Sequence, residues 1–425
     1  MNRLAIVALA LVTLGIVINA QNLTPSSVKL AFTGENSEIR VTWFTFKESK
    51  QPYVQYSTEY IQDPNTSSEE DVTFVKAESH AFLTIGWHGI PHNSILSGLA
   101  DGTTYYYAVG DKEASQWSQV YNFTTRVLSN NDQVSGPFAF AVYGDMGSVK
   151  NNVTVANLIP RVDSLDFIMH VGDIAYADLT DKSFIGGNET VWNIFLQSVE
   201  CLTSQIPYMT CPGNHDIMVD LAIYRKTFNM PTENEFDTYY SFDYRGVHFV
   251  GISSESDYFP LSPQHIWLEN DLKTYRESNP NGWVIAYAHR PIYCSTQWGW
   301  CYKSLIREKF QEYIEDIFYK YNVDLFLAGH AHDYERSLPV YQNQVMNDYS
   351  DPKATIHMVI GTGGNEEGED HDWLSAPSWS TGIRSSDTGF GQVTIINATT
   401  ILFEFIDNQS NTVLDSQYIN KGTFN

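Results

Sequence analysis

Uninterrupted apolar runs in the rear two thirds of the chain restrict its fold more than any other feature. A strand with one wet face alternates apolar and polar residues, whereas a strand covered on both faces is apolar throughout. Stretches with helical periodicity separate the runs. The pattern predicts a sheet buried between other layers. The runs cover residues 138–143, 167–171, 247–252, 284–288, 325–328 and 356–360.

Short polar motifs end the apolar strands in one fixed order. Glycine or alanine stands at the start of each motif, so the backbone can turn tightly there. Polar groups at the carboxyl ends of strands in an open sheet converge on one edge. Each motif alone is a weak signal, but five in series are specific. They read Gly144-Asp145-Met146-Gly147, Gly172-Asp173-Ile174-Ala175-Tyr176, Gly213-Asn214-His215-Asp216, Ala288-His289-Arg290-Pro291 and Gly329-His330-Ala331-His332.

One helix is predicted strongly, over residues 305–321. Apolar side chains recur there at the spacing of a single helical stripe, which predicts that this face is buried. The stripe comprises Ile306, Phe310, Tyr313, Ile314 and Ile317.

The front of the chain, residues 21–128, has a different pattern. Short alternating runs with turns between them predict an all-β sandwich. The segment from Ser97 to Tyr106 resembles the tyrosine corner of fibronectin type III domains. A polar stretch, residues 128–136, predicts a linker, and residues 137–425 then form the second domain. Nothing in the front part has catalytic spacing.

Residues 1–20 predict a cleavable signal peptide. Arg3 precedes an apolar stretch from Leu4 to Val17, and Ala20 is a small residue suited to cleavage. The alternative, a membrane anchor, needs about 20 apolar residues with basic flanks, and the segment has neither. We therefore expect a secreted, lysosomal or endosomal protein without a membrane span.

Seven Asn-x-Ser/Thr triplets agree with passage through the secretory pathway and predict a glycosylated surface. The acceptors are Asn22, Asn65, Asn122, Asn152, Asn188, Asn397 and Asn408.

The cysteines are four in number: Cys201, Cys211, Cys294 and Cys301. In an oxidising compartment an even count predicts two disulfides, for which three connectivities exist. We expect the short-range pairs, Cys201 with Cys211 and Cys294 with Cys301. Buried free thiols are the alternative.

The formal charge argues against one class of partner. Lys and Arg number 25 against 50 Asp and Glu, a net charge of −25. Such a surface repels phosphate backbones, so binding of nucleic acid through a basic face is excluded. Small phosphate esters are not excluded if metal ions make a pocket locally positive. The sequence leaves the oligomeric state open.

The five motifs together resemble the signature of the purple acid phosphatases, within the dinuclear metallophosphoesterase superfamily. The likeness extends over nearly the whole chain, including the segments Ile360–Gly364 and Thr388–Gly391. It implies a fibronectin type III-like front domain and an α/β metallophosphoesterase domain, whose two-sheet β-sandwich is flanked by helices.

The resemblance also implies a dinuclear centre of Fe(III) and a divalent metal. A ferric ion favours anionic oxygen, which Asp145, Asp173 and Tyr176 supply, with His332 completing the set. Tyr176 distinguishes this family from relatives that bind two divalent metals, because those relatives usually lack a tyrosine at this position. The divalent ion would share Asp173 and bind Asn214, His289 and His330. Zinc, manganese and ferrous iron all suit that set, so the second metal stays open.

Four residues are implied at the substrate: Asn214, His215, Arg290 and Trp298. His215 would bind phosphate or protonate the leaving alcohol as the catalytic acid. For Arg290 the sequence leaves open a phosphate contact or a brace. Where plant-type relatives carry two adjacent histidines, this chain has Trp298 and Gly299, similar to the animal-type branch. Trp298 and Trp300 either shape a substrate wall or pack on their own disulfide.

The expected function is that of a secreted acid phosphatase, hydrolysing phosphate monoesters through hydroxide attack at the metal centre. A phosphodiesterase or pyrophosphatase of the same superfamily is the first alternative, because function depends on the walls of the site. A non-catalytic adhesion module is the second.

Overall fold

The computed structural model describes residues 23–82, 87–125, 134, 136–179 and 187–422. The predicted signal peptide, Asn22 and most of the predicted linker lie outside these ranges. Among the described residues no helix has the length and apolar character that crossing a membrane requires.

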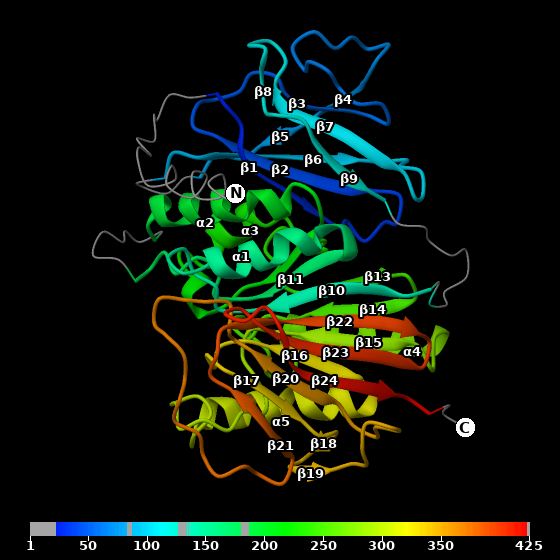
Figure 1. Ribbon diagram of the computed structural model, residues 1–425, viewed down its shortest axis with the longest axis vertical. Coiled ribbons are helices and arrows are strands. Elements are labelled where there is room, and N and C mark those ends of the chain that lie inside the picture. Colours follow the sequence, from blue (N-terminus) through cyan, green and yellow to red (C-terminus); the bar gives the residue numbers. More distant parts are fainter. Residues whose placement is uncertain (1–22, 83–86, 126–133, 135, 180–186, 423–425) are drawn as a thin grey trace, which may run out of the picture.

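The front part is a sandwich of two antiparallel sheets (Figure 1). The first has the order β1-β2-β6-β5, made of β1 (Ser26–Ala31), β2 (Ile39–Thr45), β5 (Glu78–Ser79) and β6 (Ile90–Leu96). The second has the order β4-β3-β7-β8, with β9 also pairing β7; its strands are β3 (Pro52–Ser57), β4 (Thr73–Lys76), β7 (Thr104–Asp111), β8 (Gln116–Trp117) and β9 (Tyr121–Thr124). Trp43 and Tyr107 are fully buried in the core between the sheets. The predicted tyrosine corner is present: the Tyr105 hydroxyl accepts a hydrogen bond from the Ala100 amide at 2.9 Å.

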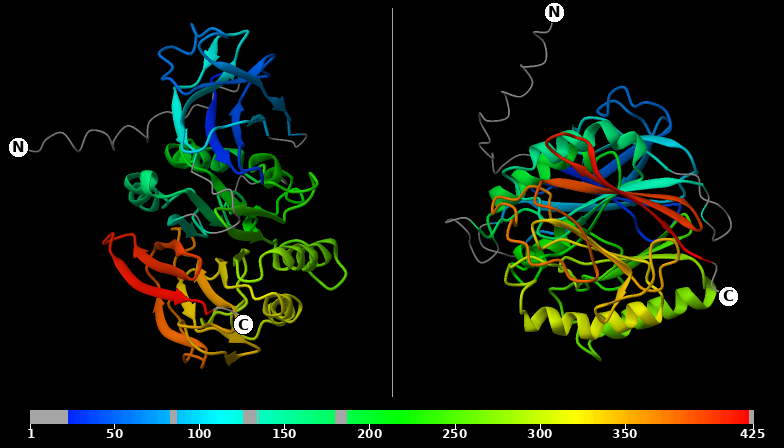
Figure 2. Two further views of the ribbon diagram at one scale, coloured as in Figure 1. Left: turned by 90° about the vertical axis from the view of Figure 1, so that its right-hand side faces the viewer. Right: turned by 60° about the horizontal axis from the view of Figure 1, so that its bottom comes forward.

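The rear part contains two larger sheets that face each other (Figure 2). One has the order β12-β11-β10-β22-β23-β24, from β10 (Phe138–Tyr143), β11 (Phe167–Val171), β12 (Tyr208–Cys211), β22 (Gly389–Asn397), β23 (Thr400–Asp407) and β24 (Val413–Asn420). The other has the order β13-β14-β15-β16-β20-β17-β21, from β13 (Tyr240–Tyr244), β14 (Val247–Gly251), β15 (Trp283–Tyr287), β16 (Leu325–Ala328), β17 (Tyr334–Ser337), β20 (Ile356–Ile360) and β21 (Ser380–Ser385). A small hairpin joins β18 (Val340–Tyr341) to β19 (Gln344–Val345).

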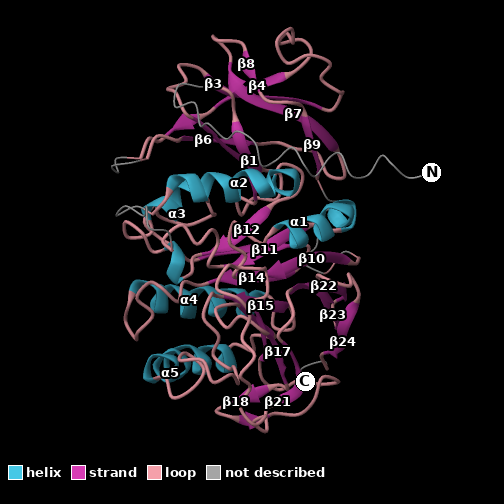
Figure 3. Ribbon diagram, turned by 60° about the vertical axis from the view of Figure 1, so that its left-hand side comes forward, coloured by secondary structure: helices cyan, strands magenta, loops and turns pink. Residues whose placement is uncertain are grey.

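Helices cover the outer faces of these sheets (Figure 3). They are α1 (Asn152–Leu158), α2 (Glu189–Thr203), α3 (Ala222–Thr227), α4 (Pro263–Ser278) and α5 (Leu305–Lys320), with 3-10 turns η1 (Ile159–Ser164) and η2 (Asn214–Asp216).

Strand β15 shows why its sequence is apolar throughout. Trp283, Ile285 and Tyr287 lie in the core between the two sheets, while Val284 and Ala286 pack in the separate core beneath α4 and α5. All five are fully buried. Both faces are thus covered, as the apolar runs predicted, and each large side chain contributes about 1.5–3 kcal/mol by burial.

The predicted stripe on α5 is wrong at one end. Phe310, Ile314 and Ile317 are buried, but Ile306 is 63% exposed. The buried core beneath this helix begins one turn later than the periodicity suggested, so the first turn projects into solvent.

Helix α2 joins the front and rear parts. The Thr203 hydroxyl donates to the Val28 carbonyl at 2.7 Å. Glu200 accepts from the Ser27 amide at 2.8 Å and from the Tyr121 hydroxyl. Just beyond the helix, Pro207 forms a parallel bridge with Leu30 of β1. The front sandwich therefore rests directly on an element of the rear domain.

One of the two disulfide predictions is confirmed and the other is wrong. Cys294 and Cys301 are bonded, as expected. The pair Cys201–Cys211 is wrong: both thiols are free. Cys201 lies on the exposed side of α2, whereas Cys211 ends β12 inside the core and is fully buried. The two face different surroundings despite their short separation in sequence.

The described glycosylation acceptors are not equally placed. Asn65, Asn122, Asn152 and Asn397 are exposed, and Asn188 caps α2, where its side chain accepts from the Thr190 amide. Asn408 is 3% exposed, and its amide nitrogen donates to the Thr154 hydroxyl at 2.7 Å. A glycan at Asn408 is therefore incompatible with this packing, contrary to the prediction.

His248 of β14 is expected to couple stability to pH. It is buried between Asp243 (2.7 Å) and Asp271 (2.8 Å). Burial opposes its charge, but hydrogen bonds to both carboxylates raise the pKa of His248 to about 9. Because the folded pKa lies above the unfolded one, the stabilisation is complete below about pH 6.5 and disappears as pH rises through about 9. Allowing for solvent around Asp243, it amounts to about 2 kcal/mol.

Urea unfolding of His248→Gln and the parent at pH 6 and pH 9 measures this contribution. The variant is expected to lose stability at pH 6 and little at pH 9. His80→Gln is the control, since His80 is exposed and also lies beside a carboxylate, Glu78, at 3.5 Å. An equal loss at both pH values would contradict the coupling.

Candidate metal centre

The predicted motifs meet at the carboxyl ends of parallel strands. Strands β10, β11 and β12 run parallel in one sheet, and β14, β15, β16 and β20 run parallel in the other. Asp145 follows β10, Asp173 follows β11, Asn214 follows β12, His289 follows β15 and His330 follows β16. The five motifs are thereby brought to one place by two sheets.

Several of these residues adopt backbone conformations that side chains disfavour. Asp145, Asp173, Tyr176 and His330 have φ angles of 58°, 50°, 54° and 68°. Left-handed residues of this kind carry strain and cluster at functional sites. Gly213 permits the close approach: a Cβ atom there would lie 2.2 Å from Oδ1 of Asp173. The backbone is thus shaped to aim these side chains inward.

Asp145, Tyr176 and His332 form a first group of ligand atoms. The Tyr176 hydroxyl lies 3.2 Å from Oδ1 of Asp145 and 3.1 Å from Nε2 of His332. Nε2 of His332 lies 3.4 Å from the same carboxylate oxygen. All three residues are buried. This group offers two oxygens and one nitrogen.

Asp173, Asn214, His289 and His330 form the second group. Nε2 of His289 lies 3.0 Å from Oδ2 of Asp173, 3.1 Å from Nδ1 of His330 and 3.2 Å from Oδ1 of Asn214. One ligand atom each from Asp173, His289 and His330 fits within 4.8 Å. The His330 amide donates to Oδ2 of Asp145 at 2.7 Å, which ties this group to the first. All seven predicted ligands therefore come together.

Hydrogen bonds outside the centre orient two of the histidines. Nδ1 of His289 contacts the Val171 carbonyl at 3.0 Å, and Nδ1 of His332 contacts the Gly368 carbonyl at 2.9 Å. Each bond directs Nε2 toward the centre, as in metal sites whose ligand histidines donate their other N–H outward.

The donor chemistry fits two different ions. Burial raises the pKa of Tyr176 well above its ordinary value, and the charges of Asp145 and Asp173 add to the effect. The phenol therefore needs a strongly charged cation to lose its proton, which suits a hard trivalent ion beside Asp145. The second group, with two imidazoles, an amide oxygen and a carboxylate, suits a divalent ion.

Asp216, the last residue of the third motif, belongs to the site although the sequence analysis gave it no role. It is 1% exposed and accepts from the amides of Gly213 (2.8 Å) and Ile174 (3.1 Å), the residue after Asp173. Burial and the charge of Asp173 raise the pKa of Asp216 to about 7. For Asp173, burial is outweighed by the charge and hydrogen bond of His289, which lower its pKa to about 2. Asp216 thus holds the two ligand loops together.

His215 faces the centre as a charged group. Its ring stacks on Tyr176 at 4.3 Å, and Nδ1 contacts Asp178 at 2.8 Å. Nε2 lies 3.6 Å from Glu367 and 3.9 Å from Asp173. Burial opposes the charge, but the hydrogen bond to Asp178 and the nearby carboxylates raise the pKa of His215 to about 9. The arrangement presents a proton donor at the mouth of the site.

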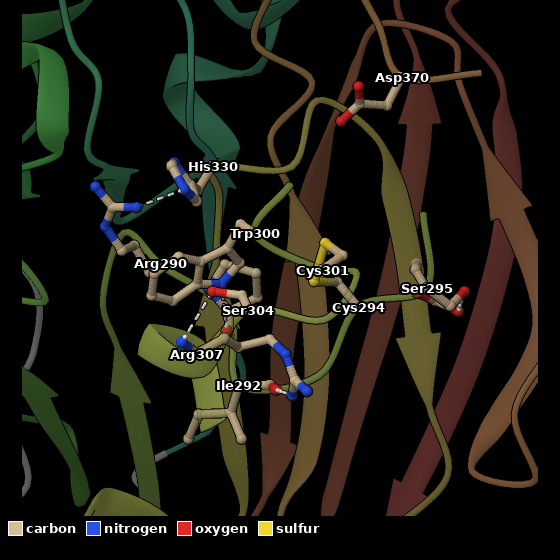
Figure 4. Close-up of a disulfide and its surroundings, with 12 residues drawn as sticks. Arg290, Ile292, Cys294, Ser295, Trp300, Cys301, Ser304, Arg307, His330 and Asp370 are labelled. Carbon is tan, nitrogen blue, oxygen red and sulfur yellow. Dashed lines mark hydrogen bonds between the residues drawn. A yellow bond between two sulfur atoms is a disulfide. The ribbon is translucent and has the colours of Figure 1, made fainter. Parts of the chain in front are cut away.

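Of the two roles that the sequence left open for Arg290, the structure shows the brace. Its guanidinium forms a bidentate pair with Glu255 (2.6 and 3.1 Å). It also contacts Nε2 of His330 at 2.7 Å (Figure 4). The guanidinium also lies over the Trp300 ring at 4.6 Å. Arg290 therefore positions His330.

A disulfide-bounded loop forms one wall of the site (Figure 4). Trp298 is 37% exposed and lies edge to face with His330, at 4.4 Å between ring centroids. Trp300, by contrast, is buried and donates to the Pro291 carbonyl at 3.0 Å. The Gln297 amide donates to the Asp372 carbonyl at 2.7 Å, so the loop is tied to the segment that carries Glu367. Trp298 thus faces the site while Trp300 supports the loop.

Comparison with known proteins agrees with this geometry. Three family models match in chain order: Purple acid Phosphatase, N-terminal domain, over residues 25–125; Calcineurin-like phosphoesterase over residues 138–334; and Iron/zinc purple acid phosphatase-like protein C over residues 354–416.

Whole-length relatives carry related names. Acid phosphatase type 7 of Homo sapiens is 31% identical over 96% of this chain and 93% of its own length. Probable purple acid phosphatase 20 of Arabidopsis thaliana is 30% identical over 93% of this chain and 87% of its own. A solved purple acid phosphatase from yellow lupin (Lupinus luteus) seeds superposes with a TM-score of 0.79 at 25% identity, covering 94% of this chain and 75% of that one.

Proposed function

Because the chain belongs to the purple acid phosphatase family, and is thus a phosphatase with a dinuclear centre of iron and a divalent metal, we propose that it hydrolyses phosphate monoesters in acid outside the cytosol. The observation that carries the proposal is His215, charged and held against Tyr176 by Asp178. The leaving alcohol must gain a proton as it departs, and the charged His215 beside the ligand residues supports its assignment as the donor.

The metal ligands, His215 and the residues at the wall have separate roles in the proposed hydrolysis. When bound, the two ions neutralise the phosphoryl oxygens and supply the attacking nucleophile. The divalent ion would be held by the second ligand group, Asp173, Asn214, His289 and His330. His215 would donate the proton of its Nε2–H to the departing oxygen. Trp298 and Glu367 limit the space around the leaving group. Since phosphoryl transfer requires mostly positioning and charge neutralisation, no protein nucleophile is needed.

Two observations support a destination in the secretory pathway. The Cys294–Cys301 disulfide suits an oxidising compartment, and exposed glycan acceptors suit a surface facing the lumen. The predicted signal peptide agrees with both. We propose that the protein is secreted or delivered to lysosomes or endosomes.

Release of the aryl alcohol by the purified, metal-loaded protein tests the proposed function, since both substrates yield it. An aryl phosphate monoester and the matching bis-aryl diester are compared between pH 4 and pH 8. We expect kcat/KM to favour the monoester and to be greatest in acid. Equal or better turnover of the diester would assign the protein to phosphodiesterases instead.

Asp178→Asn is expected to impair catalysis by loosening His215. Losing the carboxylate removes an orienting bond and lowers the pKa of His215, so the protonated form disappears at lower pH. We expect kcat in acid to fall about tenfold or more, and the alkaline limb of the kcat profile to move to lower pH. Glu369→Gln, two residues after Glu367 in the sequence, is the control. A loss of kcat without any movement of the limb would rule out a role through His215.

A further inference from the structure

A cavity at the junction of the two domains is outside the metal centre and the proposed function does not use it. Its volume is about 150 Å³. The front domain contributes the turn between β1 and β2 and the end of β9. The rear domain contributes η1, strand β13 and the residues just before β12. Figure 1 shows β9 above β13 on the right-hand side of this junction. A group bound here would contact both domains at once.

The lining has the chemistry that recognises a saccharide. Apolar surface comes mainly from the half-buried Phe32, with small exposed parts of the buried Ile206 and Phe242, and the C–H face of a sugar ring can pack against it. Carboxylates of Glu35 and Asp163 lie among them and accept hydrogen bonds from hydroxyl groups. The described residues of the lining combine apolar surface with several carboxylates and include no Lys or Arg, which suits a neutral polyol better than an anion.

The wall also carries an attachment point for a sugar. Asn122 is exposed on the edge strand β9 and lines the cavity, together with Thr124, which completes the Asn-x-Thr triplet. Asn122 differs from the buried acceptor Asn408, whose amide nitrogen is already bonded to Thr154. It differs also from Asn65, which is exposed in a loop and lines none of the described cavities.

We propose that Asn122 carries an N-linked glycan whose first N-acetylglucosamine lies in this cavity and fastens the front domain to the rear domain. The covalent link makes binding intramolecular, so even weak contacts with Phe32 and Phe242 hold the sugar in place. The glycan then acts as a further connection at the junction, in addition to the contacts of α2 with β1. It stabilises the relative position of the domains without touching the metal centre.

The test uses the full chain secreted from a eukaryotic host, with Asn122→Gln and Thr124→Ala as two independent ways to remove the glycan. Asn65→Gln is the matched control in the same domain. Glycopeptide mass spectrometry is expected to find Asn122 occupied. An amidase that cleaves N-glycans should release the glycan from native protein about tenfold more slowly at Asn122 than at Asn65, because the junction must open first.

Hydrogen exchange supplies the second readout. Asn122→Gln and Thr124→Ala should both lose amide protection in residues 32–39, 205–206 and 242–244, whereas Asn65→Gln should not. Phosphatase activity should stay unchanged in all three. An unmodified Asn122 would overturn the proposal. So would release at the same rate as from Asn65, or unchanged protection at the junction in both variants.

Discussion

Replacing Asp173 with alanine is expected to reduce kcat/KM for an aryl phosphate at least about 10³-fold. The carboxylate lies against His289 and receives the His215 amide at 2.7 Å, so one substitution removes a ligand and loosens the loop that carries Asn214 and His215. Metal analysis should show loss of the divalent ion. The measurements are phosphate release and metal content on the same preparation.

The folded state should survive this substitution. Asp173 and Asp216 repel each other in a buried setting, and the charge of Asp173 contributes to the raised pKa of Asp216. Removing Asp173 relieves that repulsion but also removes the buried ion pair with His289. The two effects oppose each other, so the urea midpoint of the metal-free protein should change little. Asp71→Ala, at an exposed carboxylate of the front domain, is the control for activity. Full activity with full metal content in Asp173→Ala would contradict the ligand assignment.

Asp415→Ala is expected to reduce the free energy of unfolding by about 3–5 kcal/mol. Arg336 of β17 is 1% exposed, and its guanidinium donates to Asp415 of β24 at 2.8 and 3.0 Å. The Tyr334 hydroxyl donates to the same carboxylate at 2.5 Å. The pair links the two rear sheets, and without Asp415 a buried positive charge has no counterion. Urea unfolding at pH 6 measures the loss.

Two further variants test whether the loss of stability comes from the unpaired buried charge or from a general disruption of packing. Asp415→Leu combined with Arg336→Leu should be more stable than Asp415→Ala alone, because no unpaired charge remains. Glu113→Ala breaks the exposed Lys50 pair and should change stability by at most about 1 kcal/mol. A double variant no more stable than Asp415→Ala would show that the charge is not the cause. Burial would raise the pKa of Asp415, but hydrogen bonds from Arg336 and Tyr334 hold it below its ordinary value, so the pair persists in acid.

The meeting of the five motifs at one place was predictable because they follow buried strands, whereas their role as metal ligands was implied by the family resemblance. In strands such as β10, β11, β16 and β20 the apolar run and the observed strand coincide, so the position of the next polar residue is determined by the sheet. Periodicity reports burial on two faces, and the carboxyl ends of parallel strands meet by geometry. In these strands the apolar run alone therefore indicates both that the strand is buried and where the residues after it lie.

Other features depend on contacts between distant segments, which no local pattern contains. Asp178 and Glu255 act through His215 and Arg290, and neither acid stands in a distinctive motif. The failed disulfide shows the converse case. Cys201 and Cys211 are close in sequence, yet the chain between them turns from a helix face into a sheet core. Spacing limits how far apart two residues can lie, but it does not set the direction of their side chains.

The bridge between Leu30 and Pro207 has a consequence for synthesis of the chain. The front sandwich leaves the ribosome first, but its strand β1 rests on α2 and on the residue before β12, which are made much later. Until then β1, buried in the finished protein, has no rear-domain partner. Nascent chains that expose unpaired apolar strands are prone to association. We expect the half-made protein to depend on chaperones until Pro207 has emerged, and chains truncated before α2 to be retained and degraded.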